Sequence, residues 1–163
     1  MTAFTKFCRA TPAVALLLLA PLGLPGVWSS PALADMAHEP VVLVTAAGER
    51  PIDAEVASTP DDMARGLMFR AKLADDQGML FPSPAPHEVN MWMKNTFIPL
   101  DMVFINADGT VRRIEAMTEP LSERVIASDG PVLAVLELAG GAAQRIGLKP
   151  GDKVRHRLFE AAR

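Results

Sequence analysis

The chain has 163 residues, half of which are apolar, and its 16 basic and 19 acidic residues give a formal net charge of −3. Lys6 and Arg9 are the only charged residues before residue 35, so the remaining 129 residues carry a net charge of −5. A chain of this size forms one domain with a substantial core. The lack of clustered Lys and Arg argues against nucleic-acid binding.

Residues 1–34 have the three parts of a secretory signal peptide. Two basic residues precede an aliphatic run at residues 14–20, and small residues lead to a cleavage site after Ala34. An uncleaved membrane anchor is the alternative, but three prolines between residues 21 and 31 interrupt the helix that would span a bilayer. We therefore expect a periplasmic or secreted protein with no stable membrane insertion after the leader is removed.

The single cysteine, Cys8, lies in this leader. The rest of the chain therefore has no disulfide, no thiol nucleophile and no thiolate metal site. Its stability must come from its apolar core.

The first half of the exported chain predicts two strands and a helix. Residues 35–40 are polar and predict a flexible arm, and a single domain is expected over residues 41–160. Residues 41–44 and 52–56 predict two antiparallel strands. Thr59 can cap a helix of about two turns that begins at Pro60 and is limited by Gly66.

The second half predicts mostly short strands. Strands are expected at residues 78–81, 87–93, 101–106, 110–117, 125–127, 132–138 and 154–159, with a short helix at 140–146. Alternate prolines at positions 82, 84 and 86 predict an exposed loop, because proline cannot donate to a sheet ladder. The pattern predicts a mainly β fold, a single antiparallel β-sandwich or barrel-like domain with one or two short helices.

The densest group of polar residues lies between residues 91 and 101. Trp92, Lys94, Asn95, Thr96 and Asp101 surround a predicted turn, where polar side chains can converge on a small ligand. In the alternative interpretation the tryptophan belongs to the core, Lys94 and Asp101 form an ion pair, and the amide and hydroxyl satisfy the turn backbone.

Glu137 is unusual because it lies inside the apolar run at residues 132–138. An ionised carboxylate there is costly unless it is paired. Lys94 and Arg70 are the candidate partners. Such a pair can be structural, or it can form one wall of a polar site.

Three other functions are open. Asp101 and Glu137 could be the two catalytic carboxyl groups of a hydrolase, one acting as acid and the other as base or nucleophile. The sequence has no recognisable catalytic motif, however, and we expect a protein that is not an enzyme. Met91 and Met93 are about 6.6 Å apart on one strand face, so they could share a Cu(I) ion. Packing in the core accounts for these methionines better. We expect no metal and no cofactor. A purely structural or interaction domain would have an exposed apolar patch and no polar pocket.

Several blocks together resemble the domain of unknown function 192 family: residues 65–70, 78–81, 91–105, 135–138 with the preceding Ser128, and 147–152. The resemblance runs in order over about residues 41–158. It implies a compact, mainly β domain, often exported, and it implies no activity.

The motif positions of that family fall here on Arg70, Trp92, Lys94, Asn95, Thr96, Asp101 and Glu137. We take these seven as candidate ligand-binding residues. The expected function is a binding module for a small polar or anionic ligand, or for a segment of a protein partner.

Overall fold

The structure of the protein is a computed structural model that describes residues 36–160. The signal peptide expected at residues 1–34 lies outside the described residues. Within residues 36–160, no helix is long and apolar enough to cross a membrane.

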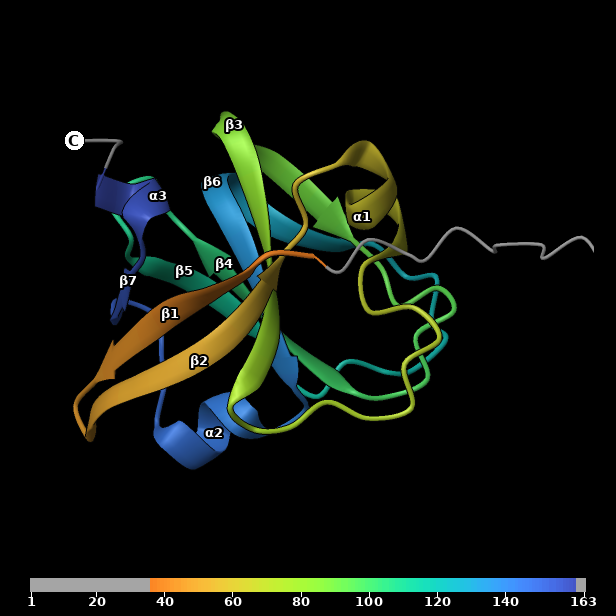
Figure 1. Cartoon of the computed structure of the whole chain (residues 1–163), viewed down its shortest axis with the longest axis horizontal. Coiled ribbons are helices and arrows are strands. Elements are labelled where there is room, and N and C mark those ends of the chain that lie inside the picture. Colours follow the sequence, from red (N-terminus) through yellow and green to blue (C-terminus); the bar gives the residue numbers. More distant parts are fainter. Residues whose placement is uncertain (1–35, 161–163) are drawn as a thin grey trace, which may run out of the picture. The chain divides into compact units, whose positions relative to one another are not determined.

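A single seven-stranded sheet forms the body of the described domain (Figure 1). In chain order the elements are β1 (His38–Thr45), β2 (Gly48–Val56), α1 (Pro60–Arg65), β3 (Gln77–Met91), β4 (Leu100–Ile105), β5 (Val111–Glu115), β6 (Ile126–Ala139), α2 (Ala142–Ile146), β7 (Lys153–Arg155) and α3 (Arg157–Glu160). The strand order is β5-β4-β6-β3-β2-β1-β7. The mainly β prediction is therefore confirmed, and residues 38–40 of the expected arm belong to β1.

The sheet curls until its two edges approach each other. Strand β7 pairs with β1 on one side, and on the other side Lys153 forms an isolated bridge with Thr110, just before β5. The amide of Val111 also donates to the carbonyl of Asp152 at 2.8 Å. The result is a half-barrel, the barrel-like form of the two architectures that the sequence predicted.

One strand pair departs from the antiparallel prediction. Strands β2 and β3 are parallel, whereas all the other paired strands are antiparallel. Parallel neighbours require a crossover connection, and residues 57–76, which include α1, supply it. The predicted cap of this helix is confirmed, because Thr59 Oγ1 accepts a hydrogen bond from the amide of Asp62 at 3.1 Å.

Two predicted interruptions are instead bulges within long strands. The proline segment at residues 82–86 belongs to β3, and its pairing with β6 pauses between Pro82 and His87. Proline has no amide hydrogen to donate to the ladder, so the strand can continue through this segment without hydrogen bonds to β6. The two strands expected at residues 125–127 and 132–138 are likewise one strand, β6. Between them, Ser128 Oγ accepts a hydrogen bond from the Val89 amide and donates one to the carbonyl of Gly130.

The end of the chain differs as well. The strand expected at residues 154–159 is the three-residue β7 followed by α3. Phe159 then turns into the interior of the half-barrel, where it is buried.

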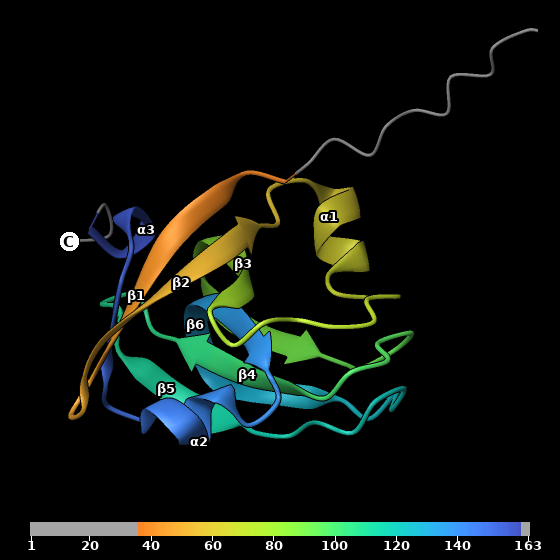
Figure 2. The same ribbon diagram turned by 60° about the horizontal axis from the view of Figure 1, so that its bottom comes forward.

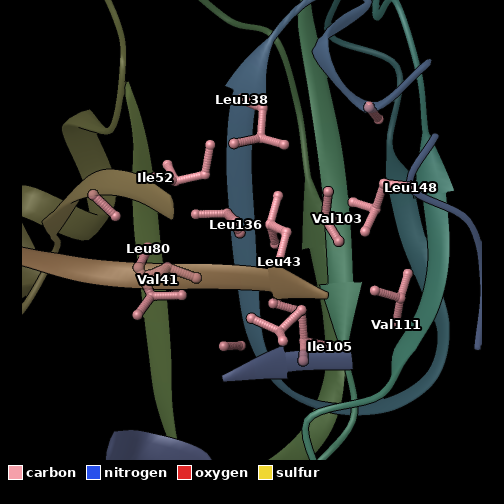
Figure 3. Close-up of a cluster of buried hydrophobic side chains, with 14 of the residues drawn as sticks. Val41, Leu43, Ile52, Leu80, Val103, Ile105, Val111, Leu136, Leu138 and Leu148 are labelled. Carbon is pink, nitrogen blue, oxygen red and sulfur yellow. The ribbon is translucent and has the colours of Figure 1, made fainter. Parts of the chain in front are cut away.

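Both faces of the central strands are covered, which explains why every residue of β4 is buried. The inner core fills the half-barrel with side chains such as Leu43 of β1, which lies close to Val103 and Leu136 of the neighbouring strands β4 and β6 (Figure 3). An outer core lies on the other face of β3, β4 and β6, and includes Leu67 and Met93 from the loops.

Candidate functional site

The sheet separates the two carboxylates that the sequence singled out. Met102 of β4 is paired directly with Glu137 of β6, so both side chains point to the same face. Met102 belongs to the outer core, and Asp101, its neighbour in the strand, therefore points to the inner face. Asp101 and Glu137 lie on opposite sides of the sheet and cannot act together as a two-carboxylate hydrolase.

Backbone amides occupy both oxygens of Asp101. It is fully buried, and its two oxygens accept hydrogen bonds from the amides of Met117 at 2.8 Å, Gly141 at 2.9 Å and Ala143 at 2.8 Å. These bonds fix the start of α2 and the end of the β5 hairpin to β4. The ion pair with Lys94 that the alternative interpretation predicted is not found within residues 36–160, because backbone donors already satisfy the carboxylate.

The cations proposed as partners of Glu137 bind elsewhere, and that prediction was wrong. Arg70 forms a two-pronged ion pair with Glu55 of β2, at 2.6 and 2.5 Å. Lys94 is exposed, and its Nζ lies 5.8 Å from the centre of the Trp92 ring. Trp92 itself is 53% exposed, so it is not part of the core.

A row of five residues across the outer face shows what surrounds Glu137. Glu55, Met79, Glu137, Met102 and Glu115 are paired in register across β2, β3, β6, β4 and β5. The two outer carboxylates have arginine partners: Glu55 has its ion pair, and Glu115 binds two guanidinium groups at 2.5 and 2.6 Å. Glu137 lies between two buried methionines and has no arginine or lysine partner among the described residues.

The carboxyl group of Glu137 is therefore a buried acid without a partner. Glu137 is 4% exposed, and its Oε2 has no hydrogen-bond partner within residues 36–160. Burial disfavours the charged form and raises the pKa of Glu137 to about 8. At neutral pH the group is a protonated acid with a proton to donate.

The acid opens into a small hollow under α1, which we call the acid pocket. Its volume is about 30 Å³, enough for one or two water molecules. The pocket is lined by Met63, Ala64, Arg65, Gly66, Leu67, Met68, Phe81, Met91, Trp92, Thr96 and Glu137. It thus brings together three of the seven predicted site residues: Trp92, Thr96 and Glu137.

The sequence reasoning missed Arg65 as a site residue. This residue ends α1 and lines the acid pocket, and no salt bridge to it is found in the described part of the chain. It belongs to the block at residues 65–70 that carried the family resemblance. Its place in the wall of the acid pocket depends on how α1 packs on the sheet, which spacing along the chain does not reveal.

Asn95 and Thr96 hold the loops beside the pocket together. Asn95 has a left-handed backbone, with φ of 55°, and its carbonyl accepts from the amide of Phe69 at 2.9 Å. The carbonyl of Thr96 accepts from the amide of Leu121 at 3.0 Å. The predicted turn is confirmed, and it ties together the loops after α1, β3 and β5, which lie side by side in both views (Figures 1 and 2).

These loops expose apolar side chains. Phe69, Trp92, Phe97 and Leu121 are each more than half exposed, and the rings of Phe69 and Phe97 pack edge to face with centres 5.9 Å apart. A pure interaction domain was expected to have an exposed apolar patch and no polar pocket, whereas here exposed apolar side chains occur together with a pocket that holds a carboxyl group.

The methionines favour packing over metal binding. Met93 is fully buried, and its sulfur accepts a hydrogen bond from Thr118 Oγ1 at 3.0 Å. Met91 packs against the outer core. Residues 36–160 contain no cluster of three or more His, Cys, Asp or Glu side chains that could hold a metal ion.

Solved structures with the same fold are related to this chain in sequence. The crystal structure of a candidate transcription regulator from Sinorhizobium meliloti 1021 matches with a TM-score of 0.75 and 43% identity, covering 78% of this chain and 99% of that protein. A protein of unknown function from Novosphingobium aromaticivorans DSM 12444 matches with a TM-score of 0.74 and 39% identity, covering 85% of this chain and 94% of that protein.

No curated protein matches this chain significantly. The family model DUF192, described as "Uncharacterized ACR", matches residues 42–156, which is most of the chain and nearly all of the described domain. The chain therefore belongs to the domain of unknown function 192 family.

Proposed function

We propose that this chain is a binding module whose acid pocket accepts a small anionic head group, a carboxylate. The observation that carries the proposal is the buried, unpartnered Oε2 of Glu137 in a pocket next to a half-exposed tryptophan. Buried polar groups are nearly always hydrogen-bonded. A ligand oxygen that accepts a hydrogen bond from protonated Glu137 would supply the missing partner.

The charges around the pocket favour an anion over a cation. Glu137 is protonated at neutral pH because burial raises its pKa to about 8, so it presents a donor and no negative charge. Arg65 lines the pocket, and Lys94 lies over the ring of Trp92 at the pocket wall. The neighbouring carboxylates Glu55 and Glu115 are neutralised by their own arginines. A hydrogen bond from a neutral acid to a carboxylate is charge-assisted and strong.

The size of the pocket limits the ligand group that enters it. A volume of about 30 Å³ suits a head group of a few atoms. Nucleic acid does not fit this chemistry, because the 129 residues after the expected leader have a net charge of −5. A role in transcription, which the name of the Sinorhizobium relative suggests for that protein, is therefore not part of this proposal.

Acetate is the probe that tests the proposal. The full chain has two tryptophans, so a Trp28→Phe background leaves Trp92 as the reporter at the pocket wall. Acetate should change its fluorescence with an affinity of about millimolar order, as expected for a ligand of four heavy atoms, while chloride at equal ionic strength should not.

Matched variants assign the binding to the pocket. Glu137→Gln, which keeps a neutral donor, should retain acetate binding, and Glu137→Leu should abolish it. Arg65→Gln should weaken it about tenfold through loss of one charge-assisted bond, whereas Arg50→Gln, at an exposed arginine on β2, should have no effect. Equal responses to acetate and chloride, or undiminished binding by Glu137→Leu, would overturn the proposal.

We also propose that the domain works outside the cytoplasm, in the periplasm or as a secreted protein, after cleavage behind Ala34. The leader pattern of residues 1–34 supports this. The intact mass of the exported protein tests it: a chain that begins at Asp35 is expected, and a membrane-bound chain that begins at Met1 would contradict it.

A further inference from the structure

A second hollow lies beside the acid pocket on the outer face of the sheet. Its volume is about 290 Å³, and it shares three wall residues with the acid pocket: Met63, Phe81 and Met91. We call it the chain groove. The two hollows are therefore adjacent, and these three side chains are all that the two walls have in common.

The bulge in β3 creates the groove. Between the pair Pro82–Ala134 and the pair His87–Val132, four residues of β3 stand opposite a single residue of β6. The extra residues bend β3 away from the sheet. Two of the four, Pro84 and Pro86, have no amide donor that would be left unpaired by the bend.

The groove is apolar, in contrast to the acid pocket. Its walls include Phe81, Val89, Met91 and Val135, with Ser83 and His87 as the polar residues. No Lys, Arg, Asp or Glu is among the described residues that line it, whereas Arg65 and Glu137 both line the acid pocket. The charged and polar groups therefore lie at the acid pocket, and the apolar surface lies at the chain groove. This arrangement matches a ligand with an anionic head and an apolar tail.

We infer that the ligand is a linear, medium-chain monocarboxylic acid, with its head at Glu137 and its hydrocarbon tail along the chain groove. The inference rests on the proposed function and specifies its substrate class. Met63 and Met91 stand between the two spaces, and unbranched methionine side chains adapt readily to a chain. Met63 is 42% exposed, so it can move without disrupting the core.

A series of acids of increasing length tests the inference on the full chain. Acetate, butanoate, hexanoate and octanoate are titrated at pH 6, below the concentrations at which the longer acids form micelles. Each methylene that enters the groove should raise the affinity about fourfold, until the groove is filled. Octanol, which has the tail without the anionic head, should bind more weakly than octanoate.

Two valine variants separate the tail from the head. Val89 lines the chain groove and not the acid pocket, so Val89→Ala should reduce the gain per methylene and leave acetate affinity unchanged. Val125→Ala removes the same atoms from an exposed valine that lines neither space, and it should change nothing.

The possible outcomes distinguish the two claims. If every acid binds with the affinity of acetate, the tail inference is wrong and the head-group proposal stands. If octanol binds as tightly as octanoate, the groove is a general apolar surface and the inference is also wrong. If neither acetate nor any longer acid binds, the proposed function fails and the inference fails with it.

Discussion

Two carboxyl groups that look alike in the sequence have opposite roles in the folded domain. Asp101 accepts three backbone hydrogen bonds, whereas Glu137 Oε2 has no partner within residues 36–160. Both are buried. The difference arises because one side chain meets the free amides at the start of α2 and the other meets methionine side chains. A carboxylate with all its hydrogen bonds made stabilises a fold, and a protonated carboxyl group without a partner is available for a ligand.

Asp101→Asn should lower the free energy of unfolding by about 2 to 4 kcal/mol. The asparagine NH₂ group would replace one of the two accepting oxygens and would then face backbone N–H groups that need an acceptor. Asp129→Asn is the matched control: this aspartate is 73% exposed, and its loss should cost less than about 1 kcal/mol. Urea denaturation measures both. Similar small losses for the two variants would show that the three bonds to Asp101 contribute little.

The sequence reached part of this residue-level picture. The apolar residues on both sides of Glu137 predict a buried acid, and the strand predicted at residues 101–106 agrees with β4 to within one residue at each end. The partners of Glu137 and Asp101 were not predictable. Which residues face each other across β2, β3, β6 and β4 depends on strand order and register, and these are long-range properties.

At the scale of elements, the site depends on loops more than on strands. The turn at Asn95 links the loop after α1 to the loop after β5 through backbone hydrogen bonds, and it sets Trp92 and Thr96 at the pocket wall. The left-handed backbone of Asn95 is one that asparagine and glycine adopt at low cost.

Asn95→Ala should therefore destabilise the domain by about 1 kcal/mol, while Asn95→Gly should be close to neutral. Asn90→Ala is the control, since Asn90 lies exposed in β3 and has no positive φ. Thermal or urea unfolding provides the comparison. Equal losses for the alanine and glycine variants would show that the side chain of Asn95, and not its backbone conformation, stabilises the turn.

The strands also show where local patterns mislead. Residues 82–86 and 129–131 carry strong turn signals, yet both lie within long strands, because a bulge in one strand is accommodated by a bulge in its neighbour. Proline and glycine indicate an interruption of the ladder. They do not reveal whether the chain then turns back or continues.

For the molecule as a whole, alternating and apolar strands were enough to predict a mainly β domain. Choosing between a sandwich and a barrel was not possible, because the choice depends on the contact between β7 and the start of β5, more than 40 residues apart. The parallel pairing of β2 with β3 was not predictable either, because it also depends on contacts between segments that are distant in the sequence. The two-faced sheet that results has a packed interior and an outer face on which loops and α1 enclose the acid pocket.

The central claim is that protonated Glu137 donates to an anionic ligand, and the pH dependence of acetate affinity tests it most directly. Folding raises the pKa of Glu137 to about 8, so the proton is present below pH 8 and lost above it. Affinity should be constant from pH 6 to 7 and fall about tenfold by pH 9. In Glu137→Gln, which cannot ionise, it should not fall. An affinity that rises above pH 8, or an equal fall in Glu137→Gln, would contradict the account.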